Sequence, residues 1–122
     1  LREILPALEQ ADMLKSERAR DVVRRLASGR SDELAGLLTE AATDRARVLL
    51  LEGLAVCGDP ALAAQAAEQL KAAGARVREA AVRTLERLAD PLYISAVTAL
   101  ATDADARVRK AVAEYTTAMC AD

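Results

Sequence analysis

The stretch Ala75-Arg76-Val77-Arg78 returns letter for letter as Ala106-Arg107-Val108-Arg109, 31 residues further along the chain. The same spacing, without a gap, separates Asp59-Pro60 from Asp90-Pro91. A weaker copy, Ala46-Arg47-Val48, lies 29 residues before the first stretch. Internal similarity with a period near thirty residues is typical of proteins that stack one supersecondary unit on the next. We therefore expect an array of repeated units.

The composition favours helices. Of the 122 residues 52% are hydrophobic, and these are mostly alanine and leucine, with no Phe or Trp and only two tyrosines. Alanine and leucine are the best apolar helix formers, whereas the β-branched and aromatic residues that favour strands are few. We predict an all-α single domain over 1–122. Because the chain opens on Leu1 rather than Met, we expect it to be part of a longer protein.

Helix start and stop signals divide the chain into eight helices. Thr43 and Asp44 precede a helix over about 45–57, Gly58 ends it, and Pro60 suits the first position of the next helix. After the second Asp-Pro pair, the apolar stripe is expected at Leu92, Ala96 and Leu100. The helices are expected to pair in units of about 1–29, 30–58, 59–89 and 90–119.

These residues resemble the HEAT-type helical repeat family. In that family an Asp lies near the turn between two antiparallel helices and a Val-Arg pair starts the second helix, as Asp103, Asp105 and Val108-Arg109 do here. The resemblance implies an α-solenoid with a right-handed superhelix and the second helices on its concave side. It also implies a structural ladder between neighbouring units, with the candidate residues Arg78, Arg109, Asp103 and Asp105. Ala72 and Gly74 replace the two acids one unit earlier, so we expect the ladder to be interrupted there.

Several classes of function are disfavoured by composition. A net charge of −2, from 17 bases and 19 acids, provides no general attraction to nucleic acid or anionic membrane. The chain has no His, which is the commonest general base and metal ligand, and no phosphate-binding loop, so we expect no catalysis, metal or cofactor. Cys57 and Cys120 are two units apart, too far for a disulfide, and are expected to be free thiols in the cytoplasm. No apolar run is long enough to span a membrane.

The second helices carry the candidate partner-binding residues. Outward positions of the third unit include Glu79 and Arg83, and a shift of 31 residues leads to Lys110 and Glu114. We expect Glu79 beside Lys110 and Arg83 beside Glu114, a pattern that also fits a simple solvated face.

An apolar strip is expected next to these charges. If the 29-residue spacing holds, the same row continues into the second unit at Leu50 and Leu54, with Leu49 beside them. Such a strip beside charged residues is typical of a protein interface. The alternative is that the helix over 45–57 is hydrophobic nearly all round because it is buried in the middle of the stack. The candidate partner-binding residues are therefore Leu49, Leu50, Leu54, Arg83, Lys110 and Glu114.

We predict a non-catalytic module that binds a partner protein, or another part of its parent chain, through the concave face of the second helices. The alternative is a nucleic-acid-binding module using an arginine ridge, with the members Arg45, Arg47, Arg76, Arg78, Arg107 and Arg109. The chain lacks Trp or Phe to stack on a base, and acids are interleaved with the arginines. Nucleic acid is therefore the less favoured partner.

Overall fold

The computed structural model describes residues 21, 23–25, 33, 35–41, 43–58 and 60–120. Within these residues the chain forms helices and turns and contains no strand, so the predicted all-α class is confirmed. The helix expected over 1–14 lies outside the described residues. In this described part, no helix combines the length and apolar character needed to cross a membrane.

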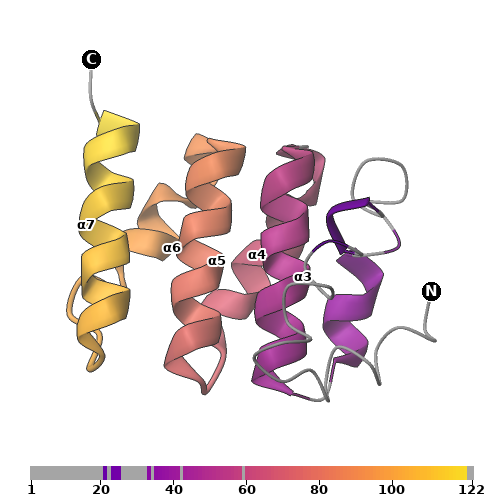
Figure 1. Ribbon diagram of the computed structural model, residues 1–122. Helices are drawn as coiled ribbons and strands as arrows, with labels where there is room; N and C mark the ends of the chain where they lie inside the picture. The colour runs from indigo at the N-terminus through magenta and orange to yellow at the C-terminus, as the bar shows by residue number, and fades with distance from the viewer. Residues whose placement is uncertain are drawn as a thin grey trace.

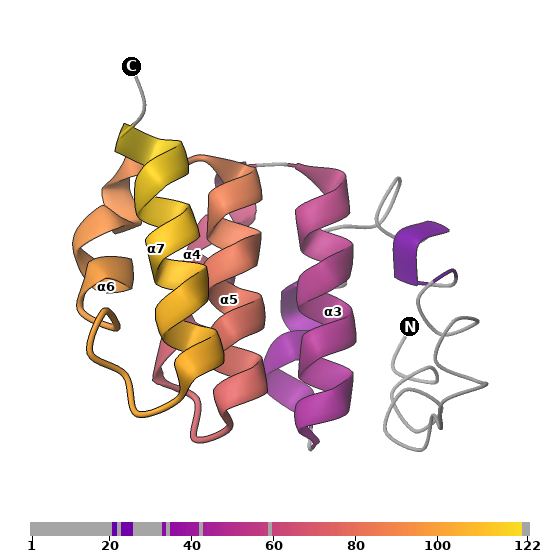
Figure 2. The same ribbon diagram turned by 60° about the vertical axis from the view of Figure 1, so that its left-hand side comes forward.

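Three long helices stand side by side in one layer, with α5 packed between α3 and α7 (Figures 1 and 2). They are α3 (Asp44–Cys57), α5 (Ala75–Leu88) and α7 (Ala106–Cys120). Shorter helices lie behind this layer in Figure 1, α4 against α5 and α6 against α7. These shorter elements are η2 (Pro60–Leu62), α4 (Ala63–Glu68), η3 (Gln69–Lys71), η4 (Pro91–Tyr93) and α6 (Ile94–Thr98), where η denotes a 3-10 helix.

The spacing of 31 residues extends further toward the N-terminus than the sequence indicated. Helices α3 and α5 begin at residues 44 and 75 and end at 57 and 88, so both bounds differ by 31, and α7 begins 31 residues later at 106. Ala46 is therefore the counterpart of Val77 and Val108, and all three side chains are buried. The 29-residue echo of Ala46-Arg47-Val48 is not the structural register.

The helix ends follow local signals in the sequence. The predicted cap at Thr43 is confirmed, since its hydroxyl accepts a hydrogen bond from the N–H of Ala46 (3.2 Å). Gly58 ends α3 as predicted, with a φ of 67° that places it in the left-handed region. Ala89 ends α5 in the same way, with a φ of 55°. A Cβ is disfavoured in that region, so Gly58 adopts it more easily than Ala89 does.

The core between the layers is made of small and medium aliphatic side chains. Its central members are fully buried in all three long helices, including Leu50, Leu54, Val77, Ala81, Leu85, Val108 and Tyr115. Thr84 is the one buried polar or charged residue in the described part of the chain. Its hydroxyl lies within hydrogen-bonding distance of the carbonyl oxygens of Leu51 on α3 (3.1 Å) and Ala80 (2.8 Å). A buried hydroxyl needs such a partner to offset its lost hydration, and this one joins α5 to α3.

The apolar stripe expected after the second Asp-Pro pair is wrong by one residue at Leu92 and Ala96, whereas Leu100 packs partly against the core as expected. Leu92 is 75% exposed and Ala96 is exposed, whereas Val97 is fully buried and Tyr93 packs partly against the core. Tyr93 lies 31 residues after the buried Leu62, so the correct stripe again follows the 31-residue register. The 3-10 turn of η4 precedes α6 and sets which residues face inward.

Candidate functional site

Arg78 on α5 and Asp103, in the segment before α7, are joined by a two-point ion pair. The guanidinium donates from Nε to Oδ2 (3.0 Å) and from Nη2 to Oδ1 (3.1 Å), and its Nη1 donates to the carbonyl oxygens of Ala72 (2.9 Å) and Ala73 (2.8 Å). The side chains are 17% and 8% exposed. Such charge-assisted pairs are stronger than neutral hydrogen bonds, so this contact ties α5 to the segment before α7.

The carboxylate of Asp103 is held in its charged form. Its hydrogen bond from Arg78, and secondarily one from the N–H of Asp105, lower the pKa of Asp103, while partial desolvation opposes them. The other two ladder candidates act within the segment that precedes α7. Asp105 accepts from the N–H of Arg107 (2.8 Å), and Arg109 donates to the carbonyl oxygen of Asp103 (2.6 Å).

The equivalent contact is missing 31 residues earlier in the chain. Arg47 on α3 lies 31 residues before Arg78, and Ala72 lies 31 residues before Asp103. The Nε of Arg47 is buried and has no hydrogen-bond partner within the described ranges, and its Nη1 is 3.9 Å from Asp44 Oδ1. The methyl group of Ala72 offers no carboxylate, which explains the unpaired Nε and agrees with the expected interruption.

The predicted charged row is formed in part. Arg83 donates to Glu114 on α7 (2.9 Å) and to Glu79 on its own helix (3.3 Å). The hydrogen bond to Glu114 is the main cause of a raised pKa for Arg83, with desolvation opposing it. Lys110 makes no ion pair with any residue that the structure describes, so the expected Glu79–Lys110 pair is absent. Because the Arg83 and Glu114 side chains are 46% and 44% exposed, their pair contributes little to stability.

The predicted apolar strip is not on the surface. Leu49, Leu50 and Leu54 are 3%, 0% and 0% exposed, so the prediction that they form an exposed strip is wrong and the buried alternative is correct. The cause is the register. With a spacing of 31, the counterparts of Glu79 and Arg83 lie two residues before those that the 29-residue spacing selected. Two residues turn a helix by about 200°, which exchanges its outer face for the core.

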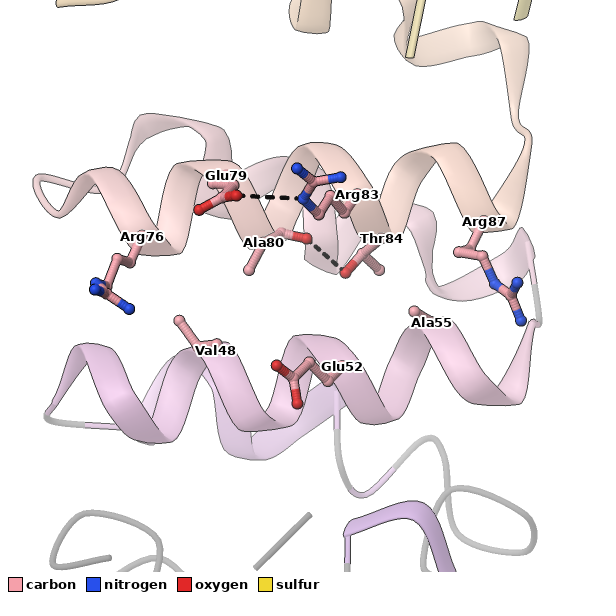
Figure 3. Close-up of a pocket in the computed structure, with 9 residues that line it drawn as sticks. All are labelled: Val48, Glu52, Ala55, Arg76, Glu79, Ala80, Arg83, Thr84 and Arg87. Atoms are coloured by element: carbon pink, nitrogen blue, oxygen red, sulfur yellow. Dashed lines mark hydrogen bonds and ion pairs between the residues drawn. The ribbon is translucent and has the colours of Figure 1, made fainter. Parts of the chain in front are cut away.

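The residues of α3 that lie 31 positions before Glu79, Arg83 and Glu86 line a groove between α3 and α5 (Figure 3). They are Val48, Glu52 and Ala55. Figure 3 shows side chains from both helices directed into the seam between them. The groove has a volume of about 350 Å³, at the lower end of the range for ligand sites. Its lining residues are Val48, Glu52, Ala55, Arg76, Glu79, Ala80, Arg83, Thr84 and Arg87.

The groove combines an apolar lining with an excess of positive charge. Val48, Ala55 and Ala80 supply the apolar part. Three arginines against two glutamates give the lining a formal charge of +1, whereas the whole chain carries −2. Arg76 and Arg87 are exposed and make no side-chain hydrogen bond or ion pair with the described residues. They lie toward opposite ends of the groove (Figure 3).

Sequence reasoning missed this groove, although its signal was present. Extending the ungapped spacing of 31 residues back from Glu79, Arg83 and Glu86 leads directly to Val48, Glu52 and Ala55. The tripeptide Ala46-Arg47-Val48, which matches Ala75-Arg76-Val77, favours a spacing of 29 residues instead.

Metal-ligating clusters and thiol side chains are few among the described residues. These residues contain no group of three or more potential metal-ligating His, Cys, Asp or Glu side chains. Cys57 is a half-buried free thiol that donates to the carbonyl oxygen of Leu54 (3.1 Å). The side chain of Cys120 lies outside the described part.

Comparisons with protein-family models, with curated proteins and with solved structures find no match for this chain. The HEAT-type resemblance therefore depends on the repeated residues of the chain itself, and the candidate site depends on its geometry.

Proposed function

We propose that this chain is a protein-binding module that holds a segment of a partner protein, or of its own parent chain, in the groove between α3 and α5. The observation that carries the proposal is the groove itself, with its apolar lining and two arginines that make no ion pair with the residues the structure describes. Protein interfaces combine an apolar centre with a polar rim, and arginine is enriched among the residues that dominate their energy. Burying Val48, Ala55 and Ala80 supplies affinity, and the charged rim sets orientation.

The scaffold of this module is a short HEAT-like solenoid. The equal 31-residue offsets of α3, α5 and α7 support stacked units, as does the Arg78–Asp103 pair between the third and fourth units. A single helix pair cannot bury its apolar face, so each unit covers its neighbour. We place the groove on the inner face of a right-handed superhelix of about four units.

A non-catalytic role fits the groove chemistry. Its lining contains no His or Cys, and its one hydroxyl, on Thr84, already lies between two carbonyl acceptors. Glu79 is engaged by Arg83. No nucleophile with an adjacent free base lines the groove, whereas binding needs only the shape and charge that are present.

Nucleic acid is the less favoured partner because only part of the arginine ridge is available to bind phosphates. The other arginines of the ridge bind groups of the fold or are half-buried. Arg78 and Arg109 donate to groups of the fold, and Arg47 is half-buried. The exposed remainder is Arg45, Arg76 and Arg107, one at the start of each long helix. These are spaced by the helix packing distance of about 8–10 Å with no aromatic ring between them to stack on a base.

The proposal is tested by obstructing the groove. Ala55→Trp places a large ring in the seam, and Ala64→Trp places the same ring on the exposed face of α4, away from the groove. In a pull-down, proteins that the immobilised chain retains should no longer be retained by Ala55→Trp but should still be retained by Ala64→Trp. Circular dichroism should show equal helicity for the two variants. Equal retention by both variants would refute the groove as the binding site. Retention that collapses between about 50 and 200 mM salt and is competed by DNA would favour the nucleic-acid alternative.

A further inference from the structure

We infer that the groove between α3 and α5 binds an extended acidic segment with two carboxylates four or six residues apart and apolar residues between them. The inference rests on the proposed function and names the chemistry of the partner. It is carried by the placement of Arg76 and Arg87, the apolar lining between them and the two glutamates that lie among that lining.

Charge complementarity selects carboxylates for the two ends of the segment. Arg76 and Arg87 keep their guanidinium donors unused by the described residues, whereas Arg83 is already bound to Glu79 and Glu114. A guanidinium matches a carboxylate through two parallel hydrogen bonds. A basic segment would instead bring like charges together at both ends of the groove.

The spacing follows from helix geometry. Arg76 and Arg87 are 11 residues apart on α5, so their Cα atoms are separated along the axis by about 16 Å. Eleven residues at about 100° each return to nearly the same face of the helix. An extended chain advances about 3.3 Å per residue and covers this distance in about five residues. Alternate side chains of an extended chain point to the same side, so two carboxylates that face the same helix surface lie an even number of positions apart. The length of the arginine side chains allows a spacing of four or six residues.

The width of the seam favours an extended segment over a helix. Packed helices such as α3 and α5 have axes about 8–10 Å apart, while a helix with its side chains is about 10–12 Å wide. A third helix would therefore lie on top of the two and would leave the groove unfilled. An extended segment can insert alternate side chains, as peptide-binding grooves commonly require.

The middle of the groove disfavours further acids. Glu52 and Glu79 lie among the lining residues, together with the apolar side chains of Val48, Ala55 and Ala80. A carboxylate placed between the two arginines would meet these glutamates. The groove therefore selects an acid, apolar residues and a second acid, and discriminates against an unbroken acidic run.

The test uses fluorescein-labelled octapeptides with the full chain, and fluorescence anisotropy measures their affinity. One peptide carries two glutamates six positions apart with alanine and leucine between them. Matched peptides carry glutamine or lysine at the same two positions, glutamates two positions apart, or glutamate throughout. We expect the first peptide to bind most tightly.

Variants of the chain show which arginines bind the peptide. Arg76→Gln and Arg87→Gln should each weaken binding of the first peptide by about two- to fivefold, and together by about tenfold, as removal of exposed ion pairs predicts. Arg107→Gln is the matched control, because it removes an exposed arginine that occupies the position of Arg76 on α7. This control should leave affinity unchanged. In nuclear magnetic resonance spectra, the Nε–H signals of Arg76 and Arg87 should shift on titration.

Several outcomes would overturn the inference. Equal affinity for the glutamate and glutamine peptides, or equal losses with Arg107→Gln, would remove the selection for paired acids. If lysine or glutamine peptides bind and Ala55→Trp abolishes that binding, the proposed function survives and the acidic partner does not. If no peptide is sensitive to Ala55→Trp, both proposals fail. A dimer in sedimentation experiments that Ala55→Trp dissociates would make a second copy of the chain the occupant.

Discussion

At the scale of single residues, positions 31 residues apart hold different side chains in the same local environment, and the difference affects stability. Gly58 and Ala89 both end a long helix in the left-handed region, but only glycine lacks the Cβ that is disfavoured there. Asp103 completes the hydrogen bonds of Arg78, while Ala72 leaves the Nε of Arg47 without a partner in the described chain. These two pairs of positions define matched substitutions.

Ala89→Gly is expected to stabilise the protein by up to about 1 kcal/mol, because it removes left-handed strain of about 1–2 kcal/mol while adding backbone freedom to the unfolded chain. Gly58→Ala should lower stability by a similar amount. Urea denaturation monitored by circular dichroism measures both changes. Shifts of the same sign for the two substitutions would contradict the explanation.

Ala72→Asp is expected to stabilise the protein by about 1 kcal/mol, because it places a carboxylate where Arg47 can use its buried Nε. The gain should disappear when the same substitution is made together with Arg47→Met. A double-mutant cycle in urea therefore measures the coupling. A gain that persists without the arginine would show that the ladder is not its source.

At the scale of elements, the sequence of α3 does not show which face of the helix is buried. The buried residues of α3 cover just over half of its circumference, and the outer face, which includes Glu52, Ala55 and Val56, keeps access to solvent. The contacts of α3 with α5, including the hydrogen bond from Thr84 to Leu51, explain why leucines that could have formed an interface are core residues.

Leu50→Asp or Leu54→Asp is expected to destabilise the fold by more than about 3 kcal/mol, because each buries an unpaired charge and removes core packing. Val56→Asp is the matched control on the same helix, since Val56 is 51% exposed. It should cost less than about 1 kcal/mol. Thermal unfolding followed at 222 nm measures all three, and a folded Leu50→Asp variant with unchanged stability would contradict the assignment of Leu50 to the core.

Asp103→Asn tests the contact between α5 and the segment before α7. The pKa of Asp103 is lowered in the folded state, so its carboxylate contributes stability above the unfolded value near 3.9 and loses it as pH falls further toward the folded pKa. At pH 7 the variant should be less stable by about 1.5–3 kcal/mol, the range for a hydrogen bond to a charged group. In urea titrations this difference should narrow steadily below pH 4, whereas a constant difference down to pH 2.5 would argue against the charged pair.

At the scale of the molecule, packing is densest at α5, which lies between α3 and α7 and contacts α4 as well (Figure 1). The counterparts of the buried Val82 and Leu85 on α7 are Ala113 and Thr116, and both are exposed. The described stack therefore presents small or polar side chains on this part of α7 and buries its large aliphatic side chains around α5.

Native-state hydrogen exchange should reflect this distribution. Amide groups of Ala81, Val82 and Leu85 in α5 are expected to exchange most slowly, because local opening there must disrupt packing on both sides. Amide groups of α6, a five-residue helix with one fully buried side chain, should exchange among the fastest of the helical amides. Faster exchange in α5 than in α6 would contradict a stack centred on α5.

The sequence by itself determined the all-α class, the cap at Thr43, the end of α3 at Gly58 and the pairing of Arg83 with Glu114. These features depend on local chemistry or on the strong repeat between α5 and α7. Local signals and a repeat of this strength can both be recognised in a single sequence. Only the tertiary structure decided which face of α3 meets solvent. Its nearly continuous apolar residues carry no clear helical period, and a two-residue error in alignment turns the helix by about 200°, so packing against α5 had to assign the leucines to the core and Val48, Glu52 and Ala55 to the groove.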